Sequence, residues 1–75
     1  MIVYGIKIER ISRPDLKPSY FKGKNGETEM TSIISYAKLF QIKDSAENKM
    51  YILQQYYKNC SDLKFSVVDI EIKEI

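Results

Sequence analysis

Apolar and polar residues alternate along the first nine positions of the chain. The large apolar side chains on one side of this run are Ile2, Tyr4, Ile6 and Ile8. A period of two residues is typical of a strand with one buried face. The pattern therefore predicts a strand that begins near the N-terminus.

The last segment of the chain, Phe65 to Ile75, alternates in the same way. We expect Val68, Ile70 and Ile72 to point into the core, and Asp69, Glu71 and Lys73 to point to solvent. Charges placed along a strand also keep an edge from pairing with other chains. This segment is predicted to be a further strand.

A helix is predicted between these strands. Its inward stripe is Ala46, Met50, Leu53, Tyr57 and Cys60, which recur at helical spacing. Asp44 is the expected N-cap, with Glu47 three residues later as the second half of a capping box. The helix should fray near residues 59–61. On the opposite side, Tyr51 and Ile52 are unusually apolar for positions that face solvent.

The dipeptide Asn25-Gly26 between two strand-like runs predicts a hairpin with a type I′ turn. A two-residue loop sets four facing pairs: Phe21 with Met30, Lys22 with Glu29, Gly23 with Thr28 and Lys24 with Glu27. Opposite charges then meet twice on one face, which stabilises the register. The hairpin is expected to be neutral overall despite its lysines.

Two segments lack one clear pattern. Arg10–Ser19 contains two prolines and three basic residues, and is predicted to be a semi-rigid surface loop. Thr31–Ile42 fits a helical stripe, and its second half also fits a short strand. We expect a turn at Thr31–Ser35 followed by a short strand.

Together these elements predict one domain over residues 1–75, of the α+β class. The expected architecture is a small antiparallel-dominated sheet of four to five strands with a single α-helix packed on one face. A domain of 75 residues buries only about 60% of its unfolded surface. We therefore expect no room for a ligand pocket of the usual size, about 300 Å³ or more.

Composition excludes several kinds of chemistry. The chain has no histidine and one cysteine, so a zinc site lacks ligands and Cys60 lacks an imidazole base. Asp69 and Glu71 share a strand face, but a solvated surface explains them. We predict no enzyme, no metal and no cofactor. No apolar run reaches the about 18 residues of a membrane span. A single cysteine fits a reducing interior, so a cytoplasmic protein is expected.

Charge is unevenly placed along the chain. Residues 1–26 hold six basic and two acidic side chains, whereas residues 27–75 hold six and eight. Arg10, Arg13 and Lys17 form a basic loop suited to carboxylate or phosphate, with a merely solvated loop as the alternative. Tyr51, Ile52 and Gln55 on the outer helix face suit contact with a protein, and Tyr56 is a further candidate there. The alternatives there are a shifted helix phase and a long loop that folds over these residues.

The run Ile34–Tyr57 resembles a pattern in small phage and mobile-element proteins. In that pattern a strand ending in Ala-basic-x-Phe leads through a polar turn into a helix, and a final strand follows. The matching positions, within about a third of the chain, are Ala37, Lys38, Phe40, Asp44, Ala46, Glu47 and Leu53. The resemblance implies an accessory factor that binds and disables a host protein, as host-takeover and anti-CRISPR proteins do.

A similar topology occurs in the DNA-binding module of phage-type integrases, which reads DNA with its exposed sheet. Here acidic residues on the hairpin and the last strand would repel phosphate. The favoured hypothesis is therefore a non-enzymatic protein that binds a host protein, plausibly inhibiting a defence system, through Arg10, Arg13, Lys17, Tyr51, Ile52 and Gln55.

Two other hypotheses stay open. One is a nucleic-acid-binding module that uses Arg10, Arg13, Lys17, Lys22 and Lys24. The other is a self-assembling protein whose edge strand pairs between copies. The expected state is a monomer or a small homo-oligomer, and no membrane partner is expected.

Overall fold

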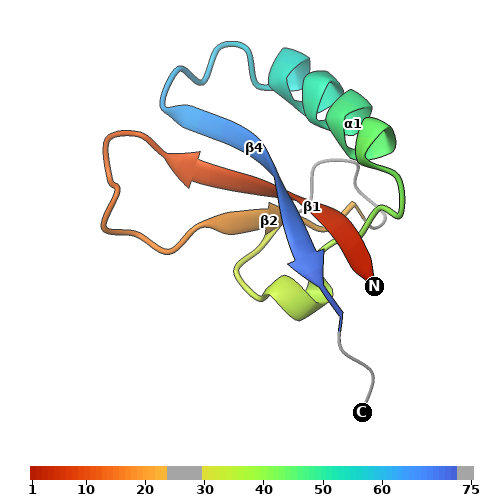
Figure 1. The fold of residues 1–75 in the computed structure, drawn as a ribbon. Helices are drawn as coiled ribbons and strands as arrows, with labels where there is room; N and C mark the ends of the chain where they lie inside the picture. The colour runs from red at the N-terminus through yellow and green to blue at the C-terminus, as the bar shows by residue number, and fades with distance from the viewer. Residues whose placement is uncertain (24–29, 73–75) are drawn as a thin grey trace.

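The computed structural model describes residues 1–23 and 30–72 (Figure 1). In chain order the elements are β1 (Ile2–Arg10), β2 (Ser19–Phe21), β3 (Met30–Thr31), the 3₁₀ turn η1 (Ile34–Tyr36), α1 (Lys43–Tyr56) and β4 (Leu63–Glu71). The strands form one antiparallel sheet in the order β3-β2-β1-β4. Within the described residues, the predicted α+β fold with one antiparallel sheet and a single α-helix is confirmed.

β1 occupies the middle of the sheet. It pairs with β4 over its whole length, from Ile2 opposite Glu71 to Arg10 opposite Leu63. Beyond the strands, Met1 and Ile72 exchange backbone hydrogen bonds of 2.8 and 3.3 Å. The alternating sequences at the two ends of the chain therefore form neighbouring strands.

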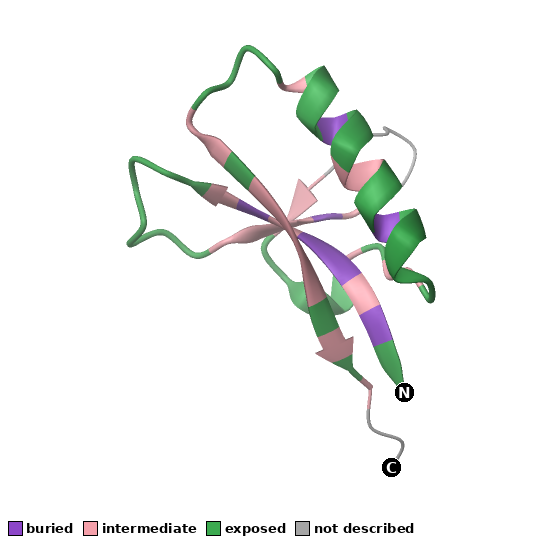
Figure 2. Ribbon diagram, turned by 45° about the horizontal axis from the view of Figure 1, so that its top comes forward, coloured by how far each residue is buried: buried purple, intermediate pink, exposed green. Residues whose placement is uncertain are grey.

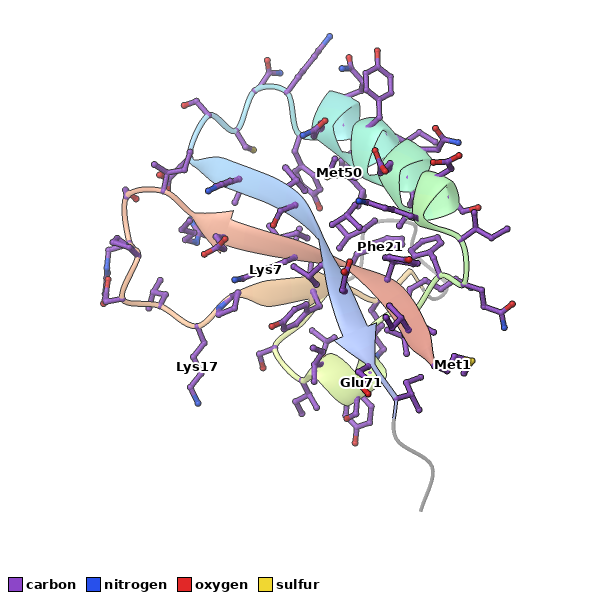
Figure 3. The ribbon with its side chains drawn as sticks, viewed as in Figure 1. Met1, Lys7, Lys17, Phe21, Met50 and Glu71 are labelled. Carbon is purple, nitrogen blue, oxygen red and sulfur yellow. The ribbon has the colours of Figure 1, made fainter. Side chains whose placement is uncertain are left out.

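The main core lies between the sheet and α1. Its buried members are Ile6, Ile8, Phe21 and Leu53, and partly buried side chains pack around them. Figure 2 shows buried positions along β1 and on one side of α1, and Figure 3 places Phe21 and Met50 between the two layers. Ala46 and Leu53 are buried, as the predicted stripe requires.

The opposite face of the sheet is also partly covered. Val3 is buried there, and it pairs with Ile70 across the β1–β4 ladder. A Cβ atom on Gly5 would lie 3.0 Å from Ile70 Cδ1 and 3.9 Å from Leu39 Cδ2, so the chain before α1 packs against this face. Figure 1 shows η1 and α1 on opposite sides of the sheet.

This second layer changes the interpretation of the last strand. Asp69 and Glu71 are exposed as expected, and Val68 and Ile70 are half-buried. However, the residue opposite Ile6 is Val67, so Val67 faces α1 while Val68 and Ile70 face away from it. The apolar residues of β4 therefore pack on both faces of the sheet, with Val67 on the α1 face and Val68 and Ile70 on the opposite face.

The chain between β3 and α1 departs from its prediction. The turn is η1 at Ile34–Tyr36, later than the expected Thr31–Ser35. The expected short strand is a single bridge, in which Tyr4 and Phe40 exchange two backbone hydrogen bonds of 2.8 Å. Phe40 therefore lies on the same side of β1 as β2, nearer to the start of β1.

The predicted helix ends are wrong at both termini. α1 begins at Lys43, the N-cap is Ile42, and Asp44 lies inside the first turn, so the predicted capping box does not form. The Asp44 carboxylate still stabilises α1, because its negative charge lies near the positive end of the helix dipole. The helix ends at Tyr56, so Cys60 lies in the following turn and is exposed, not buried on the stripe.

The predicted hairpin register is confirmed where the structure describes it. Phe21 pairs with Met30, and Tyr20 pairs with Thr31. β2 ends at Phe21, however, and Gly23 has a φ of +68°, which a regular strand does not allow. The Asn25-Gly26 turn and the partners of the predicted charge pairs lie outside the described residues.

Replacing Gly23 by alanine should destabilise the fold. A Cβ atom there would lie 2.6 Å from Cζ of Phe21, a buried core residue, and the positive φ disfavours any side chain. We expect Gly23→Ala to lower the free energy of unfolding by about 1–3 kcal/mol in urea titrations. Asn48→Ala on the exposed side of α1 is the control. Equal stability of the two variants would contradict this account.

Candidate binding surfaces

The loop after β1 is tied to the turn before β4 by Asp62. The Ser12 backbone N–H donates to Asp62 Oδ1 and the Ser12 hydroxyl donates to Oδ2, both at 2.7 Å. The Ile11 N–H also donates to the Asp62 carbonyl oxygen at 2.7 Å. These bonds from Ser12, with a smaller contribution from the charge of Arg10, lower the pKa of the Asp62 carboxyl.

Arg13 is held within its own loop. Its Nε and Nη2 atoms donate to the two carboxylate oxygens of Asp15 at 3.1 and 3.0 Å. This fork-like pairing raises the pKa of Arg13 and lowers that of Asp15. The positive charge of Arg13 is therefore balanced locally, which weakens its predicted role in binding.

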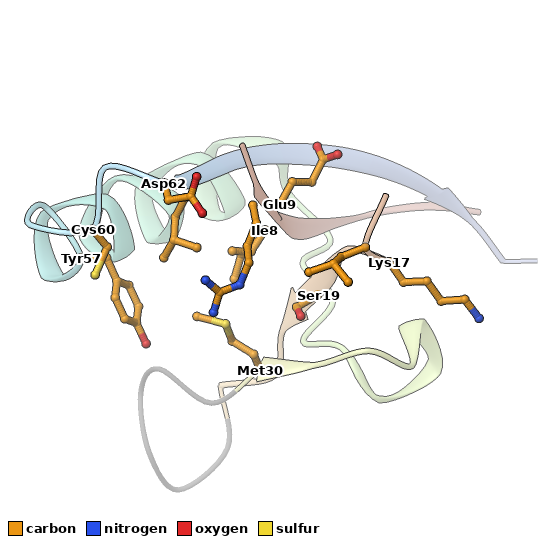
Figure 4. Close-up of a pocket in the computed structure, with 11 residues that line it drawn as sticks. Ile8, Glu9, Lys17, Ser19, Met30, Tyr57, Cys60 and Asp62 are labelled. Carbon is orange, nitrogen blue, oxygen red and sulfur yellow. The ribbon is translucent and has the colours of Figure 1, made fainter. Parts of the chain in front are cut away.

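Arg10 and Lys17 line a groove of about 400 Å³ beside the end of β1 (Figure 4). Its apolar lining is Ile8, Leu16, Met30, Tyr57 and Leu63. Figure 4 shows the Lys17 ammonium pointing away from the groove, so its aliphatic stem forms the wall. The expectation of too little room for a pocket is wrong, because the groove lies on the surface between elements and needs no core volume.

The outer face of α1 is the most apolar exposed surface of the helix. The exposed fractions are 62% for Tyr51, 54% for Ile52 and 68% for Tyr56, and Gln55 is exposed beside them. Residues four apart are neighbours on a helix, so Tyr51 lies next to Gln55 and Ile52 next to Tyr56. We call these four residues the outer patch. The predicted helix phase is confirmed here.

The predicted site residues fall on two different surfaces. Arg10 and Lys17 belong to the groove, whereas Tyr51, Ile52 and Gln55 belong to the outer patch. Tyr56, the further candidate on this face, is exposed as well. Its ring packs edge-on against Tyr57 at 4.9 Å between centroids, and Tyr57 stacks on Phe65 at 6.1 Å. Lys22 is half-buried beyond β2, and Lys24 lies outside the described residues.

Two further surface features escaped the sequence analysis. Ile33, Ile34 and Tyr36 are exposed around η1, a segment whose pattern fits two structures equally well. A second hollow of about 420 Å³ lies on the other side of Tyr57, lined in part by Gln54, Lys58, Leu63, Lys64 and Phe65. Only the packing of α1 against β4 brings these residues together.

The described part of the chain holds no group of three or more His, Cys, Asp or Glu side chains that could bind a metal ion. Within the same residues, no helix has the length and apolar character needed to cross a membrane. Comparisons with family models, curated proteins and solved structures found no match to this chain.

The Asp62 anchor should make stability depend on pH. The Asp62 carboxyl has a lowered pKa in the fold, so it stabilises the folded state fully above its ordinary pKa of 3.8. This stabilisation disappears as the pH falls through the lowered pKa. We expect Asp62→Asn to be less stable than the wild type at neutral pH. The difference should shrink in acid, as measured by urea unfolding across the acidic range.

Asp15→Asn is the matched control, because Asp15 also has a lowered pKa but bonds only within its own loop. Its effect should be smaller, since an exposed ion pair contributes little to stability. A stability difference for Asp62→Asn that is the same at every pH would contradict the assignment.

Proposed function

We propose that this chain is a non-enzymatic protein that binds another protein through the outer patch of α1. The observation that carries the proposal is the exposure by more than half of Tyr51, Ile52 and Tyr56 on one helix face. Scattered apolar residues are normal on a surface, whereas a cluster marks a contact site. Tyrosine is enriched in such sites, because it combines a large apolar ring with a polar tip.

The fold does not need these side chains. The opposite side of α1 supplies Ala46 and Leu53 to the core, and both are buried. The ring pairs that link Tyr56 to Tyr57 and Tyr57 to Phe65 hold one end of the outer patch against the sheet. A partner would therefore meet a surface that is already ordered, which reduces the entropic cost of binding.

In this proposal the partner is a host protein, and the chain acts in the cytoplasm by occupying the partner's surface. Support comes from the resemblance of Ile34–Tyr57 to phage and mobile-element accessory proteins, because that run contains the outer patch. Inhibition of a defence system is the specific form of this activity that the resemblance implies.

Nucleic-acid binding is the weaker alternative. It requires several available cations on one surface, and Asp15 already neutralises Arg13. The first test therefore separates a protein partner from a nucleic acid by treating the lysate with nuclease before capture.

The double variant Tyr51→Ala/Ile52→Ala should lose the partner. We expect this variant to capture no partner from a nuclease-treated lysate of the host cells. Its affinity for the protein that the wild type recovers should fall by at least about tenfold. Both side chains are largely exposed, so stability should change by only about 0.5 kcal/mol. Binding is measured by interferometry and stability by urea unfolding.

Ile33→Ala/Tyr36→Ala is the matched control. Tyr36 is 62% exposed, the same as Tyr51, and Ile33 is 51% exposed against 54% for Ile52. The control pair lies at η1, on the other side of the sheet (Figure 1). Equal capture by both double variants would reject the outer patch. Capture that disappears on nuclease treatment would favour the nucleic-acid alternative.

A further inference from the structure

β4 is an edge strand of the sheet, and no other strand among residues 1–23 and 30–72 pairs with its outer side. Met1 and Ile72 form a hydrogen-bonded pair at one end of the β1–β4 ladder, and Ile11 bonds to Asp62 at the other. Such pairs alternate with non-bonded pairs in an antiparallel ladder. The even-numbered residues of β4 therefore bond to β1, and the odd-numbered residues direct their N–H and C=O groups outward.

Four consecutive outward positions are available: Phe65, Val67, Asp69 and Glu71. Within residues 1–23 and 30–72, no backbone group outside the β1–β4 ladder bonds to any of them. Leu63, the fifth outward residue, donates its N–H to the Cys60 carbonyl oxygen at 3.2 Å. A row of free backbone groups of this length is a template for another strand.

The two halves of this edge carry opposite charge. The first half borders the second hollow, which Lys58 and Lys64 line together with Leu63 and Phe65. The second half carries Asp69 and Glu71, whose side chains are exposed. No ion pair within the described residues involves any of these four charged side chains.

We propose that a second copy of this chain pairs with β4, antiparallel and edge to edge. Antiparallel pairing places the acidic half of each copy against the lysine half of the other. With Val67 opposite Val67, Asp69 of one copy lies opposite Phe65 of the other, and Glu71 lies opposite Leu63. Both acids then lie on the α1 side of the sheet, where Lys58 lines the hollow, whereas Lys64 points to the other face.

This contact is self-complementary, as a two-fold interface must be. A strand of another protein would need the same order of charges, basic against Asp69 and Glu71 and acidic against the hollow. Asp69 and Glu71, which disfavour pairing of this edge with unrelated strands, also determine which residues of two copies can lie opposite each other. Pairing centred on Asp69 would place two like carboxylates directly opposite each other, which is unfavourable.

The dimer would have one continuous sheet. A two-fold axis perpendicular to the sheet keeps the two α1 helices on the same side, so both outer patches face the same direction. The inference goes beyond the proposed function and does not depend on it, because no outer-patch residue takes part in the strand pairing.

Sedimentation equilibrium over a concentration series tests the proposal. The wild type should form a dimer that weakens as salt is added, because charge pairs contribute to it. Val67→Pro removes an N–H that faces the open edge and leaves the bonds to β1 intact. We expect this variant to be monomeric, with a dissociation constant at least about tenfold higher. Val67→Ala, which keeps the N–H, is its control.

A charge exchange tests the pairing even if Val67→Pro does not fold. Asp69→Lys/Glu71→Lys alone and Lys58→Glu alone should each be monomeric. An equimolar mixture of the two should form a heterodimer, because each half then meets its opposite charge. A monomeric wild type at all concentrations, or a mixture that does not associate, would overturn the proposal. Dimerisation of each charge variant alone would also overturn it.

Discussion

The pairing of β1 with both of its neighbours is the constraint on which the rest of this structure depends. β4 lies along one side for nine residues, while β2 and then Phe40 lie along the other. β1 is also buried on both faces, with Ile6 and Ile8 beneath α1 and Val3 beneath the second layer. A 75-residue chain has little core to spare, so this strand organises nearly all of it.

This arrangement decides which parts of the sheet stay exposed. α1 packs on one face, and the chain before α1 partly covers the other. The exposed surfaces of the described residues include the outer patch of α1, the groove beside Arg10, the residues around η1 and the outer edge of β4.

The sequence predicted the parts of the fold that depend on local pattern. Alternation in Ile2–Ile8 predicted β1, and Asn25-Gly26 predicted the pairing of Phe21 with Met30. The helical stripe placed Ala46 and Leu53 inward and Tyr51 and Ile52 outward. Each of these predictions needs only residues that are close in sequence.

Contacts between distant residues were missed. The Ser12–Asp62 bonds join residues 50 apart, and the second layer depends on Leu39 and Ile70 both lying close to Gly5. The groove and the second hollow exist only because the end of α1 lies beside the ends of β1 and β4. The Arg13–Asp15 pair is local, and the i, i+2 spacing of opposite charges was the signal that could have revealed it.

Amide hydrogen exchange along β4 at low protein concentration tests the central claim most directly, that β1 pairs with β4 and leaves the outer side of β4 open. The amides of Lys64, Ser66, Val68 and Ile70, which point to β1, should exchange slowly. Those of Phe65, Val67, Asp69 and Glu71, which point outward, should exchange quickly. Slow exchange at the odd-numbered positions with fast exchange at the even-numbered ones, or equally slow exchange at every position, would contradict the account.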